Sequence, residues 1–419
     1  MAQFLKLLRN RNFFCLWLSQ VISQFGDRLN QMALIGLIYQ RAPGSAFELA
    51  KLTAFTIIPV FLIGPVAGVY VDRWDRRQTM FICDFLKFLL VLSIPLFFIF
   101  KTTLAPVYLI VFLVFSLSRF YVPAKMSLIP DLVPAEDLLL ANSLANIAGM
   151  IAAILGFGLG GILVALLGVK GGFYVNAFTF FASAILIFFI TKSVHMSKED
   201  ILTVSKEVFE VIKKSVMEEI REGAVYLFRL KEIRFIVNML FILWSALGAT
   251  YVIMIVFVQE ALQTVTRELG LLAMFLGAGL FTGSLVYGRF GQKARHFKTI
   301  FTSLIAAGIM LTLFTLLVHY VPYFLLAAGL AFLFGMIISP IMIASNTLVH
   351  EVSESAMRGK VFSYLEIVMH LAFLLFMLIS SLLAEHYERV WILVGVGTIL
   401  ILVGLIGFLR FWIKEIKAA

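Results

Sequence analysis

Few side chains in this chain could bind a charged ligand or exchange a proton, and several of those interrupt apolar stretches. Asp27 and Arg28 are adjacent within the apolar stretch that begins at Phe13. Ionisable groups are costly inside a bilayer, which makes them candidates for function. Because successive residues of a helix point about 100° apart, we do not expect both to face one cavity. Each is predicted either to line a substrate or proton pathway or to pair with another helix.

Glu366 and His370 form a second candidate site. They are four residues apart, so a helix would place them on the same face. A carboxyl and an imidazole are both able to take up and release protons near neutral pH in a suitable environment. This spacing predicts proton coupling or, as an alternative that the sequence leaves open, a packing or binding role.

Three further charged residues lie near the ends of apolar stretches. Arg119 ends the fourth stretch and is predicted to meet either an anionic group of a substrate or a carboxylate of the protein. Asp84 and Lys87 are three residues apart in the third stretch, which favours a structural ion pair.

Motifs that would indicate an enzyme are incomplete in this sequence. His350-Glu351 begins like a zinc-protease motif, but the second histidine is missing. We find neither a G-x-S-x-G elbow nor a G-x-x-x-x-G-K-[ST] phosphate loop. Cys15 and Cys83 are the two cysteines, and we expect no disulfide between them. The sequence therefore predicts no catalytic residue, no metal and no cofactor.

The elements that must position these residues are apolar helices. The chain is 62% hydrophobic and 14% charged, and a helix needs about 20 apolar residues to cross a bilayer. The apolar runs lack the period-two alternation of a β-barrel strand. We predict an all-α membrane protein with twelve transmembrane helices in two bundles of six. The expected spans are Phe13–Tyr39, Leu49–Tyr70, Met80–Phe100, Leu104–Phe120, Leu138–Leu167, Phe173–Ile190, Phe235–Val258, Leu269–Tyr287, Ile300–Val318, Pro322–Thr347, Val361–Leu383 and Val390–Phe411.

Lysine and arginine are concentrated in the loops on the side that would hold both termini. The positive-inside rule places that side in the cytoplasm. We therefore expect a multi-pass protein of the cytoplasmic (inner) membrane. The net charge of +10 is explained by loops lying against anionic lipid, so no nucleic-acid partner is expected. The first apolar stretch is too long for the h-region of a signal peptide.

The longest hydrophilic stretch divides the chain into domains at residues 1–190 and 235–419, with a linker at 191–234. Apolar residues in this linker recur at helical spacing, which predicts an amphipathic helix on the cytoplasmic membrane surface. It is expected to act as a tether, with a regulatory role as the alternative.

The two halves retain traces of a repeat. Leu128–Leu132 (LIPDL) follows the fourth apolar stretch, and Leu348–Val352 (LVHEV) follows the tenth. Arg73 and Arg289 follow the second and eighth stretches at nearly the same interval. Bundles related by such repeats are the architecture of secondary transporters.

A basic motif follows the second stretch, with Gly68, Asp72, Arg73, Arg76 and Arg77 as its members. The glycine permits close helix approach, the aspartate can face a helix N-terminus, and the arginines can bridge carboxylates on the other half. These residues and their spacing resemble the G-x-x-x-D-R-x-x-R-[RK] loop of the major facilitator superfamily. The resemblance implies a gate; the alternative is that the arginines only anchor the loop.

Longer segments narrow the resemblance. Ile63–Arg77, Pro123–Asn142, Glu222–Leu227 and Arg358–Val361 are similar to the branch that contains macrolide and enterobactin exporters, and Phe25–Asp27 with Pro123–Lys125 also resembles bacterial lysophospholipid transporters. This implies a monomeric secondary transporter that works by alternating access. The first expectation is proton-coupled efflux of an amphiphilic organic cation or neutral drug. A lysophospholipid moved inward and a siderophore or other metabolite are the alternatives. A membrane enzyme and a membrane scaffold are the remote alternatives.

Overall fold

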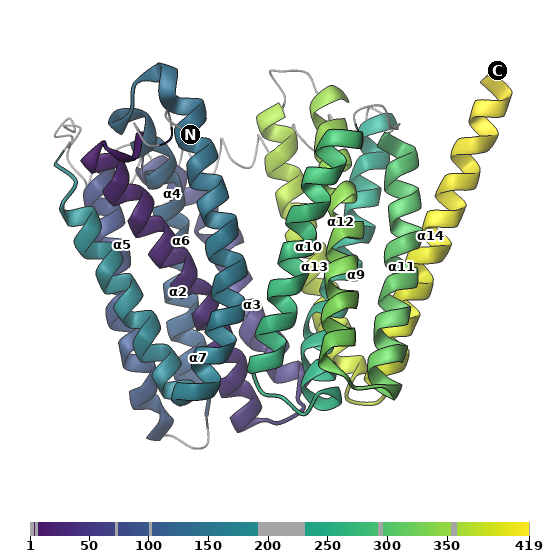
Figure 1. Ribbon diagram of the computed structural model, residues 1–419, viewed down its shortest axis with the longest axis horizontal. Coiled ribbons are helices and arrows are strands. Elements are labelled where there is room, and N and C mark those ends of the chain that lie inside the picture. Colours follow the sequence, from purple (N-terminus) through teal and green to yellow (C-terminus); the bar gives the residue numbers. More distant parts are fainter. Residues whose placement is uncertain are drawn as a thin grey trace. The chain divides into compact units, whose positions relative to one another are not determined.

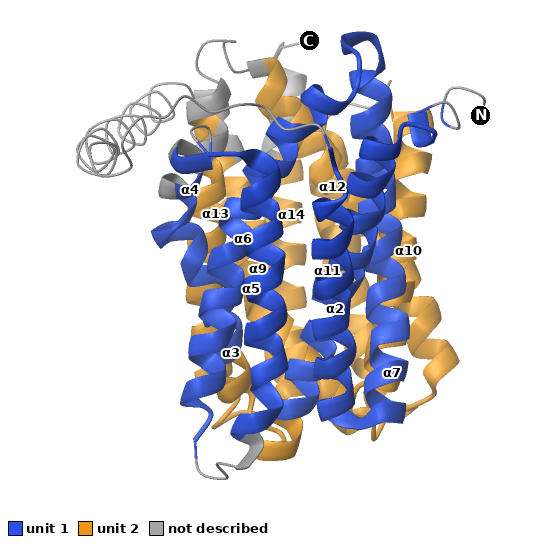
Figure 2. Cartoon of the chain, turned by 90° about the vertical axis from the view of Figure 1, so that its left-hand side faces the viewer, with its two compact units in different colours: residues 1–37, 52–217 blue, residues 38–51, 218–419 orange. Residues whose placement is uncertain are grey.

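Helices account for almost all of the regular structure that the computed structural model describes, which covers residues 4, 7–71, 74–99, 103–191, 231–291, 296–352 and 358–418. Nine helices in these ranges are long and apolar enough to cross a membrane by length and composition. The predicted all-α membrane fold is confirmed. The chain divides into unit 1, Met1–Leu37 with Leu52–Met217, and unit 2, Ile38–Lys51 with Glu218–Ala419 (Figure 2).

The helices follow the predicted spans closely. The first helix with described bounds is α2, Arg11–Arg41, whose last residues belong to unit 2. Unit 1 continues with α3 (Ala46–Leu62, of which residues 46–51 group with unit 2), α4 (Gly64–Val71), α5 (Arg76–Ser93), the 3₁₀ helix η1 (Ile94–Ile99), α6 (Ala105–Leu132), η2 (Ala135–Asp137) and α7 (Leu138–Phe188). Unit 2 holds α9 (Lys231–Ala261), α10 (Arg267–Phe290), α11 (His296–Tyr320), α12 (Phe324–Val352), α13 (Arg358–Leu383) and α14 (Arg389–Ala418), as labelled in Figure 1.

Helix α7 contains two of the predicted spans. Its 51 residues would extend about 76 Å at about 1.5 Å per residue, more than twice the hydrocarbon core of about 30 Å. Gly168 lies inside it with a φ of 74° and a ψ of 169°, which breaks the helix there. Glycine adopts this left-handed backbone without a Cβ clash. The break falls between the expected spans Leu138–Leu167 and Phe173–Ile190.

The second predicted span, Leu49–Tyr70, is divided into α3 and α4 at Ile63. Pro59 lies inside α3, and Pro65 is the second residue of α4. Proline has no backbone N–H to donate to the preceding turn, which interrupts a helix at such points.

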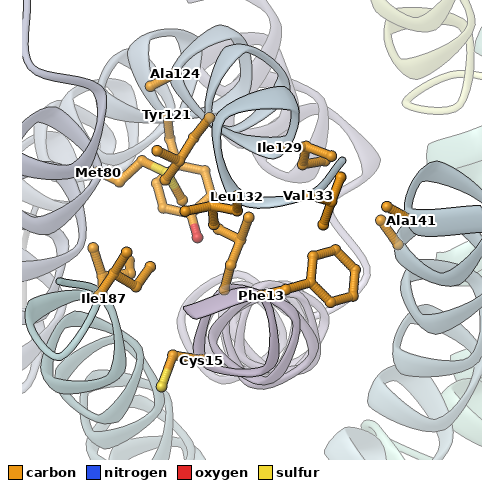
Figure 3. Close-up of a cluster of buried hydrophobic side chains, with 14 of the residues drawn as sticks. Phe13, Cys15, Met80, Tyr121, Ala124, Ile129, Leu132, Val133, Ala141 and Ile187 are labelled. Atoms are coloured by element: carbon orange, nitrogen blue, oxygen red, sulfur yellow. The ribbon is translucent and has the colours of Figure 1, made fainter. Parts of the chain in front are cut away.

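Unit 1 contains an apolar cluster that joins α2, α4, α5, α6 and α7 (Figure 3). Phe13 and Cys15 come from α2, and Met80 from α5. Tyr121 lies on α6, and the cluster also includes Ala124, Ile129, Leu132, Val133, Ala141 and Ile187. Close contact between α2 and α7 occurs at Gly156 and Gly160, where an added Cβ would meet Arg28 and the Leu29 backbone.

Unit 2 uses glycine in the same way. Gly248 of α9 faces the carbonyl of Phe373 on α13, and Gly279 of α10 faces the carbonyl of Phe332 on α12. A methyl group at either position would clash with backbone, which cannot move as a side-chain end can. Arg389 donates to Glu260 Oε2 and to the carbonyl of Gly44, both at 2.6 Å, and so fixes the segment Ile38–Lys51 within this unit.

Most of the predicted linker, 191–234, lies outside the described residues, so its amphipathic helix stays a prediction. The proposed boundaries at 190 and 235 stay predictions as well.

Candidate functional site

Asp84 and Lys87 form the most deeply buried pair of charges among the described residues. Asp84 is 0% and Lys87 is 2% exposed, and their Oδ1 and Nζ atoms are 3.6 Å apart. Ser183 of α7 donates to the other carboxylate oxygen at 2.5 Å. The ammonium lies 4.8 Å from the ring centroid of Tyr121 and 5.2 Å from that of Phe180. The predicted ion pair is confirmed, and it lies in the core of unit 1.

Asp27 belongs to the same electrostatic environment. The charges that act on its carboxyl are Lys87 first and Arg28 second. Arg28 itself donates to Gln31 Oε1 at 3.3 Å, and its guanidinium lies 5.2 Å from the centroid of the Phe157 ring. The two adjacent residues therefore have different neighbours, as the 100° step of a helix requires.

The spacing of buried residues along α5 is a sequence signal for this cluster. Met80, Cys83, Asp84, Lys87 and Val91 are all buried on α5, and they recur at helical spacing. Charges within such a stripe face the core rather than lipid or water. That α7 brings Ser183 to Asp84 depends on the contact between two helices, which the periodicity of neither helix contains.

The basic motif makes its contacts within unit 1. Arg76 donates to Asp131 Oδ2 at 2.6 Å and to the carbonyl of Ser127 at 3.0 Å. Arg77 donates to the carbonyl of Phe188 at 3.0 Å. Within unit 1, Asp131 is the acid within reach of Arg76, because Arg76 opens α5 beside the end of α6. A bridge from these arginines to carboxylates of the other half stays a prediction.

The other motif residues are only partly described. Gly68 lies in α4, while Asp72 and Arg73 lie outside the described residues. Asp75 caps α5 by accepting the backbone N–H of Gln78 at 2.7 Å. The gating role of the motif stays a prediction.

Unit 2 contains the counterpart of the Arg76 contact. His296 Nε2 lies 3.3 Å from Glu351 Oε1. His296 follows Arg76 by the same interval as Glu351 follows Asp131. Both pairs join the start of one helix, α5 or α11, to the end of the next, α6 or α12. The repeat seen in the sequence is therefore a repeat of contacts.

Glu366 and His370 share a face of α13 as predicted, but their side chains do not pair with each other. His370 Nδ1 donates to the main-chain carbonyl of Glu366 at 2.8 Å. The imidazole lies 5.9 Å from the Trp244 ring of α9, and Trp244 is 6.2 Å from the Phe373 ring. Tyr251 of α9 is 5.5 Å from the Phe373 ring. The His370 imidazole thus borders an aromatic group made by two helices, α9 and α13.

Arg119 lies on α6 and is half-buried. Its two expected roles, toward an anionic group or toward a carboxylate, stay predictions. Among the described residues, no group of three or more His, Cys, Asp or Glu side chains could hold a metal ion.

The geometry so far defines a polytopic helical protein with two units that repeat helix order and contacts, as in secondary transporters. A family model described as Major Facilitator Superfamily matches residues 16–262 and 235–419. The chain belongs to the major facilitator superfamily, and it is a multi-pass membrane protein.

Similar proteins are also transporters. The chain is 25% identical over 412 residues to the MFS-type transporter YkuC of Bacillus subtilis (strain 168), covering 96% of this chain and 93% of that protein. It is 22% identical over 407 residues to macrolide efflux protein A of Streptococcus pyogenes, covering 94% of each. A match at 29% identity to the MFS-type transporter YfiS of Bacillus subtilis (strain 168) spans about half of either chain, 54% of this one and 51% of that one.

Solved structures support the fold. The crystal structure of a bacterial homologue of the iron transporter ferroportin, in an inward-facing state, has a TM-score of 0.71 at 15% identity and covers 96% of this chain and 99% of that chain. An auto-inhibited peptide transporter of the POT family has a TM-score of 0.72 at 11% identity, covering 95% of this chain and 96% of that chain. At these identities the likeness concerns the fold alone. None of these relatives is named as a lysophospholipid transporter, so the similarity lends that alternative no support.

Proposed function

We propose that this protein is a monomeric secondary transporter of the cytoplasmic membrane that exports an amphiphilic organic cation or neutral drug in exchange for protons. Both termini lie in the cytoplasm in this proposal. Transport proceeds by alternating access and involves no enzymatic step. The full-length similarity to a protein named for macrolide efflux supports export of a drug-like molecule.

The proposed substrate class rests on one observation, the face of α13 on which Glu366 is exposed. The lipid-type side chains exposed on α13, Leu371, Leu375 and Ile379, are 54%, 48% and 43% accessible. At about 100° per residue they fall roughly 140–220° around the helix from Glu366, whereas His370 and Phe373 fall within about 40° of it. Glu366 is exposed on this opposite side. An ionisable group within a transmembrane segment faces protein or a water-filled path, not lipid.

The surroundings of Glu366 suit a cation with an apolar body. A carboxylate attracts the charge, and the faces of Trp244, Tyr251 and Phe373 bury apolar surface and attract cations through their π electrons. Aromatic side chains combined with one acid are the elements of sites for organic ammonium groups. We therefore assign substrate recognition in unit 2 to Glu366 and His370 of α13, together with Trp244, Tyr251 and Phe373.

Proton coupling is assigned to Asp27 in unit 1. A carboxylate inside a membrane span must either protonate or find a cation. The two cations that act on Asp27 have other partners: Lys87 pairs with Asp84, and Arg28 donates to Gln31. Asp27 is therefore proposed to bind and release the transported proton.

The basic motif is proposed to control the balance between conformations. Asp72→Asn, or Arg73 and Arg76 both replaced by Ala, should leave insertion intact and shift the accessibility of engineered cysteines on the two membrane faces. An unchanged accessibility pattern with full transport would remove this part of the proposal.

The substrate assignment is tested in proteoliposomes with an imposed proton gradient and no ATP. Tetraphenylphosphonium and a macrolide serve as cationic probes, and a neutral amphiphile of similar size serves as comparison. Glu366→Gln is expected to raise the KM for the cations at least tenfold and to change that of the neutral probe far less. Glu385→Gln, a change of an exposed acid beyond the end of α13, is the matched control. Equal effects of Glu366→Gln on cationic and neutral probes would contradict recognition of the charge.

A further inference from the structure

Three polar side chains follow one another along the middle of α2 in unit 1. Gln24, Arg28 and Gln31 recur at helical spacing, and at about 100° per residue they lie within an arc of about 60°, which we call the polar stripe. All three are partly buried, and no residue of α2 from Cys15 to Tyr39 is exposed. This stretch of α2 is therefore not a lipid-facing surface. Polar and charged groups at such a place face protein or a water-filled path.

Helix α7 leaves room for the side chains of the polar stripe. A Cβ added to Gly149 would lie 2.7 Å from Gln24 Oε1, and one added to Gly156 would lie 2.9 Å from Arg28 Cβ. The guanidinium carbon of Arg28 lies 5.2 Å from the centroid of the Phe157 ring. A larger residue at either glycine would therefore displace a polar side chain of α2.

The positive charge of Arg28 has no acid beside it in the described ranges. Its Nη1 donates to Gln31 Oε1 at 3.3 Å, and its Nε has no hydrogen-bond partner there. The ion pairs of the described residues, each with 4.0 Å or less between nitrogen and oxygen, do not include Arg28. Its charge acts on Asp27, but that residue is turned about 100° away on the helix. A guanidinium has five N–H donors in a planar fork, so Arg28 is able to bind a further acceptor.

The repeat relates the polar stripe to aromatic residues of unit 2. The interval that relates the contact at the start of α5 to that at the start of α11 places Trp244, Gly248 and Tyr251 of α9 at the three positions of the stripe. Trp244 and Tyr251 belong to the group proposed to recognise the substrate, and glycine stands where unit 1 has its arginine. The two units thus have opposite chemistry at equivalent positions, with donors and a positive charge on α2 and aromatic rings on α9.

We propose that Arg28, with the amides of Gln24 and Gln31 on either side, binds a carboxylate of the transported substrate and so selects zwitterionic molecules. A guanidinium forms paired hydrogen bonds with a carboxylate, and one arginine balances one negative charge. The carboxylate neutralises a charge that is otherwise costly inside a membrane span. The cationic group of the same molecule is left for Glu366 in unit 2. This inference rests on the proposed transport and narrows its substrate to a molecule that carries both charges.

The test compares two probes that differ in the carboxylate alone. Norfloxacin is a zwitterion at neutral pH, and its ethyl ester keeps the ammonium group without the carboxylate. KM and kcat for both probes are measured in proteoliposomes with the purified full-length protein, which is expected to have the lower KM for norfloxacin. Arg28→Gln should raise that KM about tenfold or more, because a charge-assisted hydrogen bond is lost, and should change the KM for the ester less than about twofold.

Two further variants serve as control and as second test. Arg41→Gln removes the same charge from the end of the same helix and should leave the KM for both probes unchanged. Arg28→Lys keeps the charge but not the planar fork, and should raise the KM for norfloxacin about threefold without changing that for the ester. This variant also serves if Arg28→Gln does not fold.

An equal change of KM for both probes in Arg28→Gln, or a lower kcat for both with KM preserved, would show that Arg28 acts through Asp27 or through packing. A lower KM of the unmodified protein for the ester would contradict selection of zwitterions. Either result would overturn the present inference and leave the proposed export in place. Failure to transport norfloxacin, its ester and tetraphenylphosphonium alike would remove the proposed export, and this inference with it.

Discussion

At the start of both α5 and α11, a basic side chain contacts an acid at the end of the following helix, but the basic residue differs. Arg76 at the start of α5 binds Asp131 at 2.6 Å, and His296 at the start of α11 lies 3.3 Å from Glu351. A guanidinium is charged at every physiological pH, whereas an imidazole is charged only when protonated. The repeat has thus kept the position of the contact and made its strength in unit 2 depend on protonation.

The same two helices differ further along. Helix α5 buries Asp84 and Lys87, whereas α11 has Leu304 and Ala307 at the equivalent points. The buried polar residues described in unit 2 are serines, threonines and a glutamine, Gln259, and none is charged. Unit 2 instead has an exposed acid on α13, Glu366, on the same face of the helix as His370. This contrast supports a division in which unit 1 handles the proton and unit 2 recognises the cationic part of the substrate.

The largest loss of stability is expected when only one residue of the buried Asp84–Lys87 pair is replaced. Lys87→Met leaves Asp84 in the core without its counter-charge, and removal of one partner from a buried ion pair costs about 3–5 kcal/mol. Leu304→Asp places an unpaired carboxylate at the equivalent point of α11 and should be comparably destabilising. Thermal unfolding in detergent measures both. If the Lys87→Met protein unfolds at the same temperature as the unmodified protein, Asp84 is already neutral or hydrated.

The next largest effect is expected when Asp27, proposed for proton coupling, and Glu366, proposed for substrate recognition, are replaced one at a time. Asp27→Asn should reduce proton-driven transport at least tenfold while substrate exchange across the membrane continues, because exchange needs no proton. Glu366→Gln should keep the driven mode at saturating substrate. Transport with and without a proton gradient distinguishes these outcomes. If Asp27→Asn keeps full driven transport and Glu366→Gln abolishes it, the roles of the two units are reversed.

These residues also show how much of the structure can be predicted from a single sequence. Hydropathy located all twelve spans because the thickness of the bilayer imposes one length on every crossing. The Asp84–Lys87 pair could be expected because both residues lie on one helix. The hydrogen bond from Ser183 to Asp84 could not, since it joins α7 to α5, and spacing within either helix carries no information about that. The contact of Arg389 with Gly44 is of the same kind, between residues far apart in the chain.

The basic motif illustrates a different limit. Its spacing identified the family, because the residue types are specific, but it did not identify the partner of each arginine. Asp131 was visible as part of the repeated LIPDL segment, and its pairing with Arg76 required the end of α6 to lie at the start of α5. The motif identifies which charged residues are present, while the distances between helices decide which of these residues are in contact.

A smaller effect is expected from removing the acids of the two equivalent contacts. Asp131 and Arg76 are 21% and 28% exposed, whereas Glu351 is 55% exposed. A better shielded and shorter pair is worth more, so Asp131→Asn should cost about 1 kcal/mol and Glu351→Gln a few tenths. Thermal unfolding of the two variants at one pH and salt concentration gives the comparison. A greater loss for Glu351→Gln would mean that the pair in unit 2 has further partners.

The smallest effect concerns the charge of the contact in unit 2. His296→Arg replaces an imidazole by a guanidinium that is charged at every physiological pH. Because Glu351 is 55% exposed, the variant should be more stable than the unmodified protein by only a few tenths of a kcal/mol. Thermal unfolding of both proteins at pH 8 measures the difference. His296→Arg combined with Glu351→Gln is the control, because it removes the acid and should abolish the gain. A gain that persists in the control would show that the arginine acts through packing at the start of α11. The two units would then differ in the geometry of this contact and not in its charge.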